Sequence, residues 1–262
     1  QFAMVPMNLL GAGTLSTYII TGAWSKAAAK EALRFGRVQS AFSGSGNRIP
    51  ADEELEVIPE TSYCAYCDNE TIHGIEFERV PVLKDAEAVP LVADMTSNFL
   101  TRPVDVNKFG LFYASAQKNL GIAGLAVIVL RRDLLGLAGT EVPTLLNYSV
   151  YSRTDSVPNT PPVFQLYVAN LMAQWIEAHG GVAVMDEYAR ARAKIVYDAI
   201  DAMPEMYVSH VERESRSRVN AVFRLKDEAL TALFVKEAAE AGLANLAGHR
   251  AVGGIRASMY NA

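Results

Sequence analysis

Two short apolar runs each lead to one charged side chain that could do chemistry. Leu91 to Ala93 reads as a buried strand ending at Asp94, and Gly110 to Ala114 reads as another that delivers Lys118 soon after its end. Ligands bind at the carboxyl ends of strands in open α/β sheets. A lysine in a partly dry site is more readily neutral and can attack a carbonyl to form a Schiff base, while an aspartate suits a cationic ring nitrogen. The pair therefore fits pyridoxal phosphate (PLP), with the lysine on the aldehyde carbon and the aspartate on the pyridinium.

Each of these residues also has an ordinary structural interpretation. An aspartate at a strand end is commonly a turn or helix cap, and a lysine after a strand is commonly solvated. Trp24 follows the β-rich run Tyr18 to Ile20 at the start of an alanine-rich helical pattern, where it is either a core anchor or a cover for a flat ring. Spacing alone leaves these alternatives open, so the rest of the chain must decide.

Composition excludes several classes of protein. The 262 residues carry a formal net charge of −5, so we expect no general attraction to nucleic acid or to acidic membranes. No apolar run approaches the roughly 18 residues that span a bilayer, and the start shows no signal-peptide pattern, so we expect a cytoplasmic protein. Cys64 and Cys67 have CxxC spacing but no second Cys or His pair, and they fall in a strand-like run where they would face opposite sides. We expect no metal site.

The order of elements predicts an α/β sheet followed by a smaller α+β part. Strands are expected at 18–20, 38–42, 63–67, 72–77, 91–93, 110–114 and 125–130, with a turn at 68–71 and a helix at 26–35 capped by Ser25. Composition shifts to Asn, Ser, Thr, Asp and Pro at 144–162, where we place a domain transition. We expect helices at 164–179, 182–203 and 228–241, and strands at 219–225 and 255–259. The first domain would be residues 1–150, and residues 151–262 would hold the remaining large-domain helix and the small domain.

Five separated motifs resemble those of the phosphoserine aminotransferase family, in the same order along the chain. They are Asn69-Glu70-Thr71, Ala93-Asp94-Met95-Thr96-Ser97, Ala114-Ser115-Ala116-Gln117-Lys118-Asn119, Asn159-Thr160-Pro161-Pro162, and Gly248-His249-Arg250 with Gly253-Gly254-Ile255-Arg256-Ala257-Ser258. The resemblance implies a fold-type I, class V PLP enzyme, with a mainly parallel mixed sheet flanked by helices and a smaller α+β C-terminal domain. It implies a homodimer that exchanges the amino group of glutamate with 3-phosphohydroxypyruvate, giving O-phosphoserine and 2-oxoglutarate in serine biosynthesis.

The resemblance also implies a role for each matching residue. Lys118 matches the Schiff-base lysine, Asp94 the partner of the pyridinium nitrogen and Trp24 the residue stacked on the ring. The remaining matches are Thr71 as a hydroxyl ligand of the cofactor, Gln117 as a phosphate ligand, Asn159 and Thr160 as residues that reach the cofactor phosphate of the neighbouring subunit, His249 and Arg250 as the pair that grips the substrate phosphate, and Arg256 as the arginine that binds the substrate carboxylate. Arg213, Arg216 and Arg218 match no role, and we interpret them as a solvated rim that attracts dianionic substrate.

The ends of the chain depart from the family pattern. The chain begins at Gln1 in mid-pattern, whereas the family has an upstream loop that contains glycine and arginine and holds the cofactor phosphate. At the other end, the family continues past Ala262 into a further helix of the small domain. We therefore expect a chain truncated at both ends. Three alternatives stay open: another class V aminotransferase, a cysteine desulfurase, which would need a mobile catalytic cysteine, and a non-catalytic chain that keeps the fold and a dimer interface.

Overall fold

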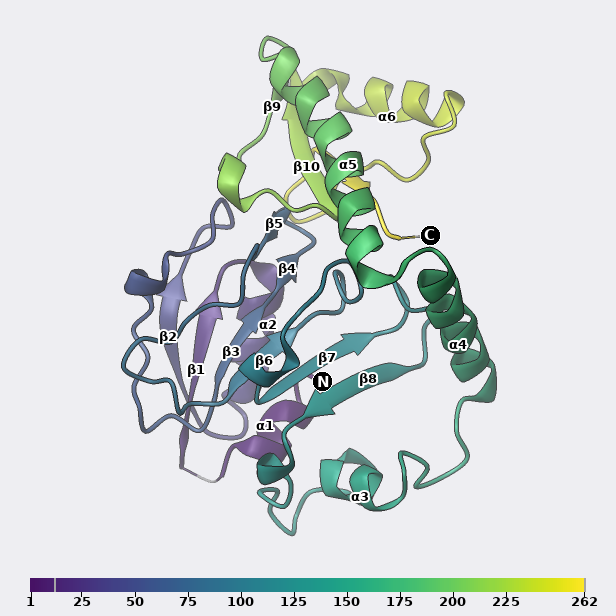
Figure 1. Cartoon of the computed structure of the whole chain (residues 1–262). Coiled ribbons are helices and arrows are strands. Elements are labelled where there is room, and N and C mark those ends of the chain that lie inside the picture. The colour runs from purple at the N-terminus through teal and green to yellow at the C-terminus, as the bar shows by residue number, and fades with distance from the viewer. Residues whose placement is uncertain (12, 262) are drawn as a thin grey trace.

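The computed structural model describes residues 1–11 and 13–261. A six-stranded mixed sheet lies at the centre of its larger part (Figure 1). Its strand order is β2-β1-β3-β6-β7-β8. The strands are β1 (Leu15–Ile20), β2 (Arg37–Ser43), β3 (Cys64–Cys67), β6 (Leu91–Asp94), β7 (Leu111–Ser115) and β8 (Ala126–Leu130). The first five strands pair in parallel, and β8 runs antiparallel to β7. The parallel strands bring their carboxyl ends to one edge, as the sequence predicted.

The two faces of the sheet bury different side chains because residues alternate along a strand. Tyr18 and Val92 lie in one cluster, which the helices α1 (Met4–Leu9) and α2 (Ala23–Ala32) cover through Val5, Leu9, Ala29 and Ala32. Their strand neighbours Ile19 and Ala93 lie in the other cluster, which segments outside the regular elements cover through Leu55, Leu83, Val89 and Phe109. Both faces are therefore apolar, which explains the continuous apolar runs of β3, β6 and β7.

A three-stranded antiparallel sheet of order β11-β10-β9 lies in the C-terminal part of the chain (Figure 1). Its strands are β9 (Tyr207–Val208), β10 (Asn220–Leu225) and β11 (Ile255–Ser258). The helices α4 (Val163–Ala178), α5 (Gly181–Ala202) and α6 (Thr231–Glu240) belong to the same part of the chain, whereas α3 (Tyr148–Arg153) lies below β8 in Figure 1, away from this sheet. Ile200 of α5 packs with Phe223, Leu225 and Ile255 in one cluster. The predicted domain 151–262 ends at Ala262, which lies outside the described residues. No helix of the described residues is long and apolar enough to span a membrane.

Local predictions were wrong in two segments. The turn predicted at 68–71 lies at 71–74 instead, because Asn69–Glu70 (β4) and Ile75–Glu76 (β5) pair as a small antiparallel hairpin. The strand predicted at 72–77 is therefore only the two residues of β5. Gly74 adopts φ +76, and a Cβ there would lie 2.8 Å from the Val222 side chain. Ser25 is not the N-cap of its helix, since α2 begins at Ala23 after Gly22. Its hydroxyl instead accepts the backbone N–H of Gly22, from the third helical position.

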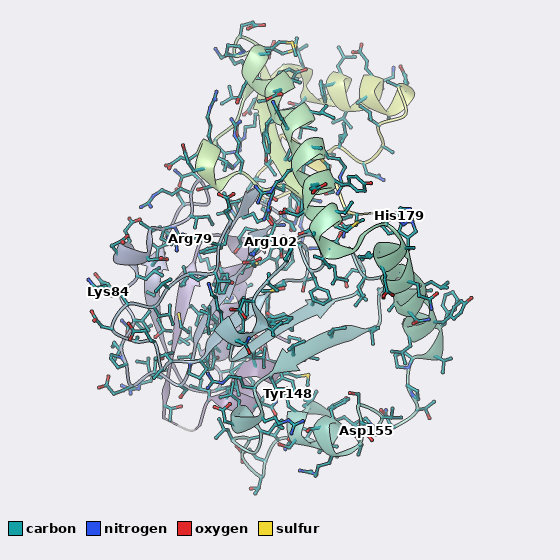
Figure 2. The ribbon with its side chains drawn as sticks, in the orientation of Figure 1. Arg79, Lys84, Arg102, Tyr148, Asp155 and His179 are labelled. Carbon is teal, nitrogen blue, oxygen red and sulfur yellow. The ribbon has the colours of Figure 1, made fainter. Side chains whose placement is uncertain are left out.

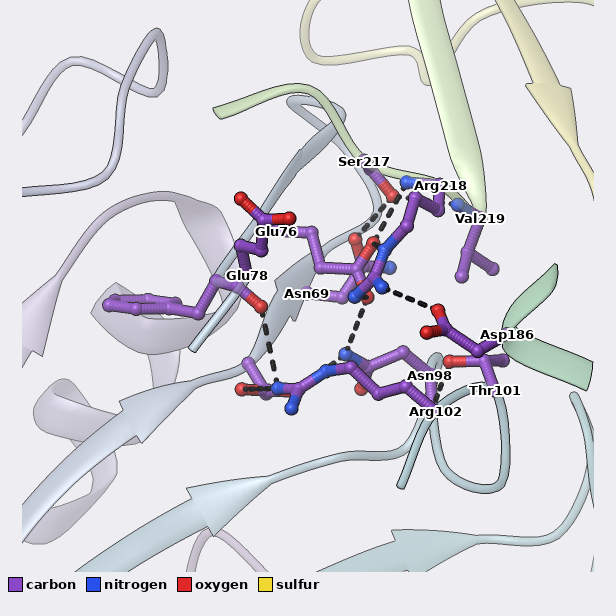
Figure 3. Close-up of polar contacts among 12 residues, drawn as sticks. Asn69, Glu76, Glu78, Asn98, Thr101, Arg102, Asp186, Ser217, Arg218 and Val219 are labelled. Carbon is purple, nitrogen blue, oxygen red and sulfur yellow. Dashed lines mark hydrogen bonds and ion pairs between the residues drawn. The ribbon is translucent and has the colours of Figure 1, made fainter. Parts of the chain in front are cut away.

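Buried charges join the hairpin to the C-terminal part of the chain, as Figure 3 shows for Glu76, Arg218 and Asp186. Arg218 donates from Nη2 to Glu76 Oε1 at 3.0 Å and from Nη1 to Asp186 Oδ1 at 2.8 Å. Asn98 bridges Glu76 to Asp68, and Arg102, which lies near the base of α5 in Figure 2, pairs with Asp68. Each buried charge therefore has an opposite charge or a polar partner.

The interpretation of Arg213, Arg216 and Arg218 as a solvated rim was wrong for two of the three. The Arg218 side chain is buried, as described above. The Arg216 side chain is only 12% exposed, because it forms a bidentate pair with Asp201 and stacks on the Tyr197 ring. Arg213 is exposed and pairs with the same aspartate at 3.1 Å. Because acidic side chains pair with these guanidinium groups, the three arginines stabilise the fold rather than attract an anionic substrate.

Candidate active site

An open cavity of about 740 Å³ lies at the carboxyl edge of the six-stranded sheet. Four of the predicted site residues line it from three separate segments: Trp24, Asp94, Gln117 and Lys118. Trp24 comes from the start of α2, Asp94 is the last residue of β6, and the other two follow β7. The cavity is of the size that holds a small cofactor with its substrate.

Lys118 is half-buried beside Asp94, as its place after β7 predicted. Burial lowers the pKa of Lys118 and the charge of Arg256 lowers it further, whereas the negative charges of Asp94 and Glu70 raise it. β6 and β7 are hydrogen-bonded neighbours, with Asp94 opposite Tyr113, so the two charged residues leave adjacent strand ends. The amine is therefore more readily neutral than a solvated lysine and faces a carboxylate across the cavity.

Asp94 is held by its own turn. Its Oδ1 accepts the backbone N–H of Thr96 at 2.9 Å, so the cap role considered for a strand-end aspartate is real. A carboxylate can accept about four hydrogen bonds, so this cap leaves acceptor capacity for a ligand. Burial and then the charge of Asp94 raise the pKa of Tyr113, whose hydroxyl thus stays protonated next to the carboxylate.

Trp24 and Thr71 meet at the same edge although they lie in different elements. The Trp24 Nε1–H donates to Thr71 Oγ1 at 3.0 Å. The indole is 39% exposed, and the Phe2 ring lies against it at 6.4 Å between centroids. Trp24 is therefore not a buried core anchor, and one of its two predicted uses, a cover for a flat ring, remains available.

Arg256 reaches the site from β11. Its Nη1 donates to the backbone oxygen of Thr71 at 3.4 Å, across 185 positions of sequence, and its charge lowers the pKa of Lys118. The tertiary fold therefore places this predicted substrate arginine within electrostatic range of the amine.

Thr71 and Arg256 do not line the cavity, and neither do four other predicted residues. Asn159 and Thr160 are exposed in the loop between α3 and α4, which Asp155 marks in Figure 2. His249 and Arg250 lie in the turn before β11, where His249 Nδ1 accepts the backbone N–H of Ala251 at 3.2 Å. Burial lowers the pKa of His73, and the nearby His210 and then His249 lower it further. The described chain alone does not bring these four residues together with Lys118.

The donor set of the cavity fits PLP. Lys118 offers an amine, Asp94 an acceptor for a ring N–H, Trp24 a partly exposed aromatic face and Gln117 an exposed amide. These groups match an aldehyde, a pyridinium, a flat ring and a phosphate respectively.

Cys64 and Cys67 are free and buried, and burial raises the pKa of both thiols, that of Cys64 to about 12. Among the described residues no cluster of His, Cys, Asp or Glu could hold a metal ion.

Sequence reasoning missed two buried acids of the β4–β5 hairpin, Glu70 and Glu76. Both are fully buried, and each binds a distant segment. Glu70 lies in the polar run Asp68 to Thr71, which we interpreted as a turn, and in the motif Asn69-Glu70-Thr71, to which only Thr71 contributed a role.

Comparisons with known proteins agree with this geometry. A family model described as "Aminotransferase class-V" matches residues 1–262. The phosphoserine aminotransferase of Chromobacterium violaceum is 44% identical over 265 residues, which cover 100% of this chain and 73% of the relative. The structure of phosphoserine aminotransferase from Bacillus circulans subsp. alkalophilus has a TM-score of 0.95 at 42% identity, covering 100% of this chain and 72% of that chain. The structure of PLP-bound phosphoserine aminotransferase from Trichomonas vaginalis has a TM-score of 0.92 at 39% identity, covering 100% and 75%. The mixed sheet flanked by helices matches these structures, so the fold predicted from the sequence is confirmed.

Proposed function

The chain belongs to the class-V aminotransferase family, and we propose that it transfers the amino group of glutamate to 3-phosphohydroxypyruvate, giving O-phosphoserine and 2-oxoglutarate, with PLP as cofactor. Relatives at 44% identity carry the name phosphoserine aminotransferase, which supports this substrate pair. The observation that carries the proposal is that Lys118 and Asp94 leave adjacent strand ends and line one cavity with Trp24 and Gln117. We also propose a role in serine biosynthesis and a cytoplasmic location, and the two free cysteines suit a reducing compartment.

When bound, PLP supplies an electrophilic aldehyde and a ring that withdraws electrons from the substrate. Asp94 would hold the proton on the ring nitrogen, since its carboxylate offers the anionic acceptor that a pyridinium prefers. Lys118 would bond to the aldehyde carbon and, once the substrate displaces it, move a proton from the substrate Cα. Its lowered pKa favours this use because a neutral amine can accept that proton.

Trp24 would cover the ring, Thr71 would contribute a hydroxyl to the cofactor and Gln117 would contact its phosphate. Arg256 would bind the substrate carboxylate, because a guanidinium matches a carboxylate with two parallel hydrogen bonds. His249 and Arg250 would bind the substrate phosphate.

The partner in this proposal is a second copy of the chain. Asn159 and Thr160 would reach the cofactor phosphate in the neighbouring subunit, and their exposure in the loop between α3 and α4 supports that role. We also propose residues 1–150 as the cofactor-binding domain, with residues 151–262 supplying a further large-domain helix and the small α+β domain.

A reconstitution experiment tests the proposal. PLP added to the purified chain should give the absorbance of a lysine-bound cofactor, and borohydride should fix the cofactor on Lys118. Lys118→Ala should lose the fixed adduct and lower transfer from glutamate by at least about a hundredfold, since a positioned acid–base group contributes that much. Lys108→Ala is the matched control, because Lys108 is an exposed lysine that does not line the cavity and should leave both signals intact.

The amino acceptor decides between related functions. Phosphohydroxypyruvate, glyoxylate and pyruvate should be compared at equal concentration, and we expect clear preference for the phosphorylated acceptor. Indifference to the phosphate would favour another class V aminotransferase and would count against His249 and Arg250. A chain that folds but shows no spectral change with PLP would favour the non-catalytic alternative. A desulfurase is disfavoured because both cysteines are buried in β3.

A further inference from the structure

Glu70 is a buried carboxylate that the proposed roles leave unused. It ends β4, is 0% exposed, and accepts three hydrogen bonds from the first turn of α2. The Trp24 backbone N–H donates to Oε2 at 2.9 Å, while the Ser25 backbone N–H and hydroxyl each donate to Oε1 at 2.7 Å. A side chain 45 positions away in sequence thus satisfies the free N–H groups at the start of this helix. A negative charge is also favourable at a helix N-terminus.

We infer that Glu70 is a positioning residue that sets the Trp24 indole and the Thr71 hydroxyl against each other at the cofactor site. This inference rests on the proposed function, which assigns those two groups to the cofactor. Glu70 holds the backbone of Trp24 through its carboxylate and holds Thr71 as its covalent neighbour. The hydrogen bond from Trp24 Nε1 to Thr71 Oγ1 then closes a ring of contacts. Neither group can move without breaking one of these bonds.

The packing around the carboxylate leaves little room for movement. A Cβ on Gly22 would lie 2.6 Å from Glu70 Cδ and 2.8 Å from Oε2, so the absence of a side chain at Gly22 permits this approach. Ser25 Oγ also accepts the backbone N–H groups of Thr21 and Gly22, at 3.0 and 3.1 Å. The hydroxyl that binds Glu70 is therefore itself fixed on its other side.

The charge of Glu70 matters as well as its shape. Burial raises the pKa of Glu70, while its hydrogen bonds from Ser25 and Trp24 lower it. All three partners are donors, so an ionised carboxylate can accept from each of them. A glutamine of the same shape would turn an NH₂ group toward at least one N–H or O–H donor. Glu70→Gln is therefore a sharp test of the inference.

The test measures local order in the cofactor-free chain as well as cofactor binding. In a Trp175→Phe background Trp24 is the remaining tryptophan, so its emission and its indole N–H signal report on this site alone. Glu70→Gln should speed amide hydrogen exchange at Trp24 and Ser25 by about 10- to 100-fold, because hydrogen bonds to a charged group are lost. The exchange of Ala29, further along α2, should not change by more than about twofold. The dissociation constant of PLP should rise about tenfold, with borohydride still fixing saturating cofactor on Lys118.

Glu76→Gln is the matched control because Glu76 is the buried acid of the partner strand β5 and does not contact α2. It should leave Trp24 emission unchanged, and any rise in exchange at Trp24 and Ser25 should be matched at Ala29, because a general loss of stability acts on the whole helix. If Glu70→Gln does not fold, Glu70→Asp keeps the charge, withdraws it by one methylene and should show the same local effect to a smaller degree.

Two outcomes would overturn the inference. One is unchanged exchange at Trp24 and Ser25 with unchanged PLP affinity. The other is a uniform rise in exchange along α2, which would make Glu70 a general stability residue. A wild-type chain that binds PLP but transfers no amino group would instead contradict the proposed function, while the measurements on the cofactor-free chain would still decide the role of Glu70.

Discussion

The indole of Trp24 donates a hydrogen bond to the hydroxyl of Thr71 at 3.0 Å, which ties the first turn of α2 to the turn after β4. The two residues are 47 positions apart, and only Trp24 of the two lines the cavity. The residues proposed as ring cover and hydroxyl ligand are thus joined before any ligand enters. This reduces the side-chain freedom that binding would otherwise remove.

Replacing Thr71 with valine should separate this unit. Thr71→Val keeps the shape but removes the acceptor, so we expect PLP affinity to fall about 2- to 10-fold, the loss of one neutral hydrogen bond. Trp24 emission in a Trp175→Phe background should shift at the same time. Thr71→Ser keeps the hydroxyl and should stay close to wild type. Equal affinities for the valine and serine variants would contradict a role for the hydroxyl.

Removing the Asp94 charge should change the titration of Lys118. Burial lowers the pKa of Lys118 and Asp94 raises it, so Asp94→Asn should lower that pKa further. The pH profile of acylation of the Lys118 amine, followed by peptide mass spectrometry in the cofactor-free chain, should shift to lower pH. The charges of Glu70 and Arg256 also act on this amine and remain unchanged in the variant. A profile that moves to higher pH would contradict the electrostatic pairing.

The lowered pKa of Lys118 also makes the folding stability depend on pH. A lysine whose pKa is lower in the folded chain binds fewer protons there than in the unfolded chain between the two pKa values. Stability contributed by Lys118 should therefore rise with pH through that window, and Asp94→Asn should extend the window downward. Urea unfolding at several pH values measures how the free energy of unfolding changes with pH, and Lys118→Met is the reference that removes the titrating group.

The buried pair of Glu76 and Arg218 should be costly to break from one side. Their side chains are 1% and 11% exposed, so Glu76→Gln or Arg218→Met leaves a buried charge without its full partner set, at a cost of about 3–5 kcal/mol each. The double variant should cost less than the two single costs together, because no uncompensated charge remains at the pair. Urea unfolding of the wild type, the two single variants and the double variant gives the coupling free energy between Glu76 and Arg218. Strict additivity would show that the pair does not act as a unit.

Mixed dimers test whether Asn159 serves the neighbouring subunit. Asn159→Asp places a negative charge toward a phosphate and should inactivate the protein alone, as Lys118→Ala does. If Asn159 acts across the interface, refolding the two variants together in equal amounts should restore about a quarter of wild-type activity, since half of the dimers then contain one intact site. No recovery, with mixed dimers shown to be present, would place Asn159 in its own subunit.

The sequence alone determined the sheet and the position of its ligand edge. Short apolar runs such as Leu91 to Ala93 and Leu111 to Ala114 are long enough for strands, and the polar residue that ends each run has to leave at the carboxyl edge. Asp94 and Lys118 were therefore predictable as neighbours once the strands were parallel and adjacent. Trp24 was considered as a ring cover from its place after a strand, whereas Thr71 and Gln117 came from the family resemblance; Trp24 and Gln117 line the same cavity.

Only the tertiary structure decided which polar groups are buried and what they touch. Glu70 stands 45 positions from Ser25, Arg218 stands 142 positions from Glu76, and Arg256 stands 185 positions from Thr71. Local propensity carries no information about such pairs, so Glu70 looked like a turn residue and Arg218 like a surface charge. A charged side chain is stable in the interior only where the fold brings a partner to it. That partner comes from a distant segment, which is why sequence patterns located the site and the three-dimensional packing decided how it is held.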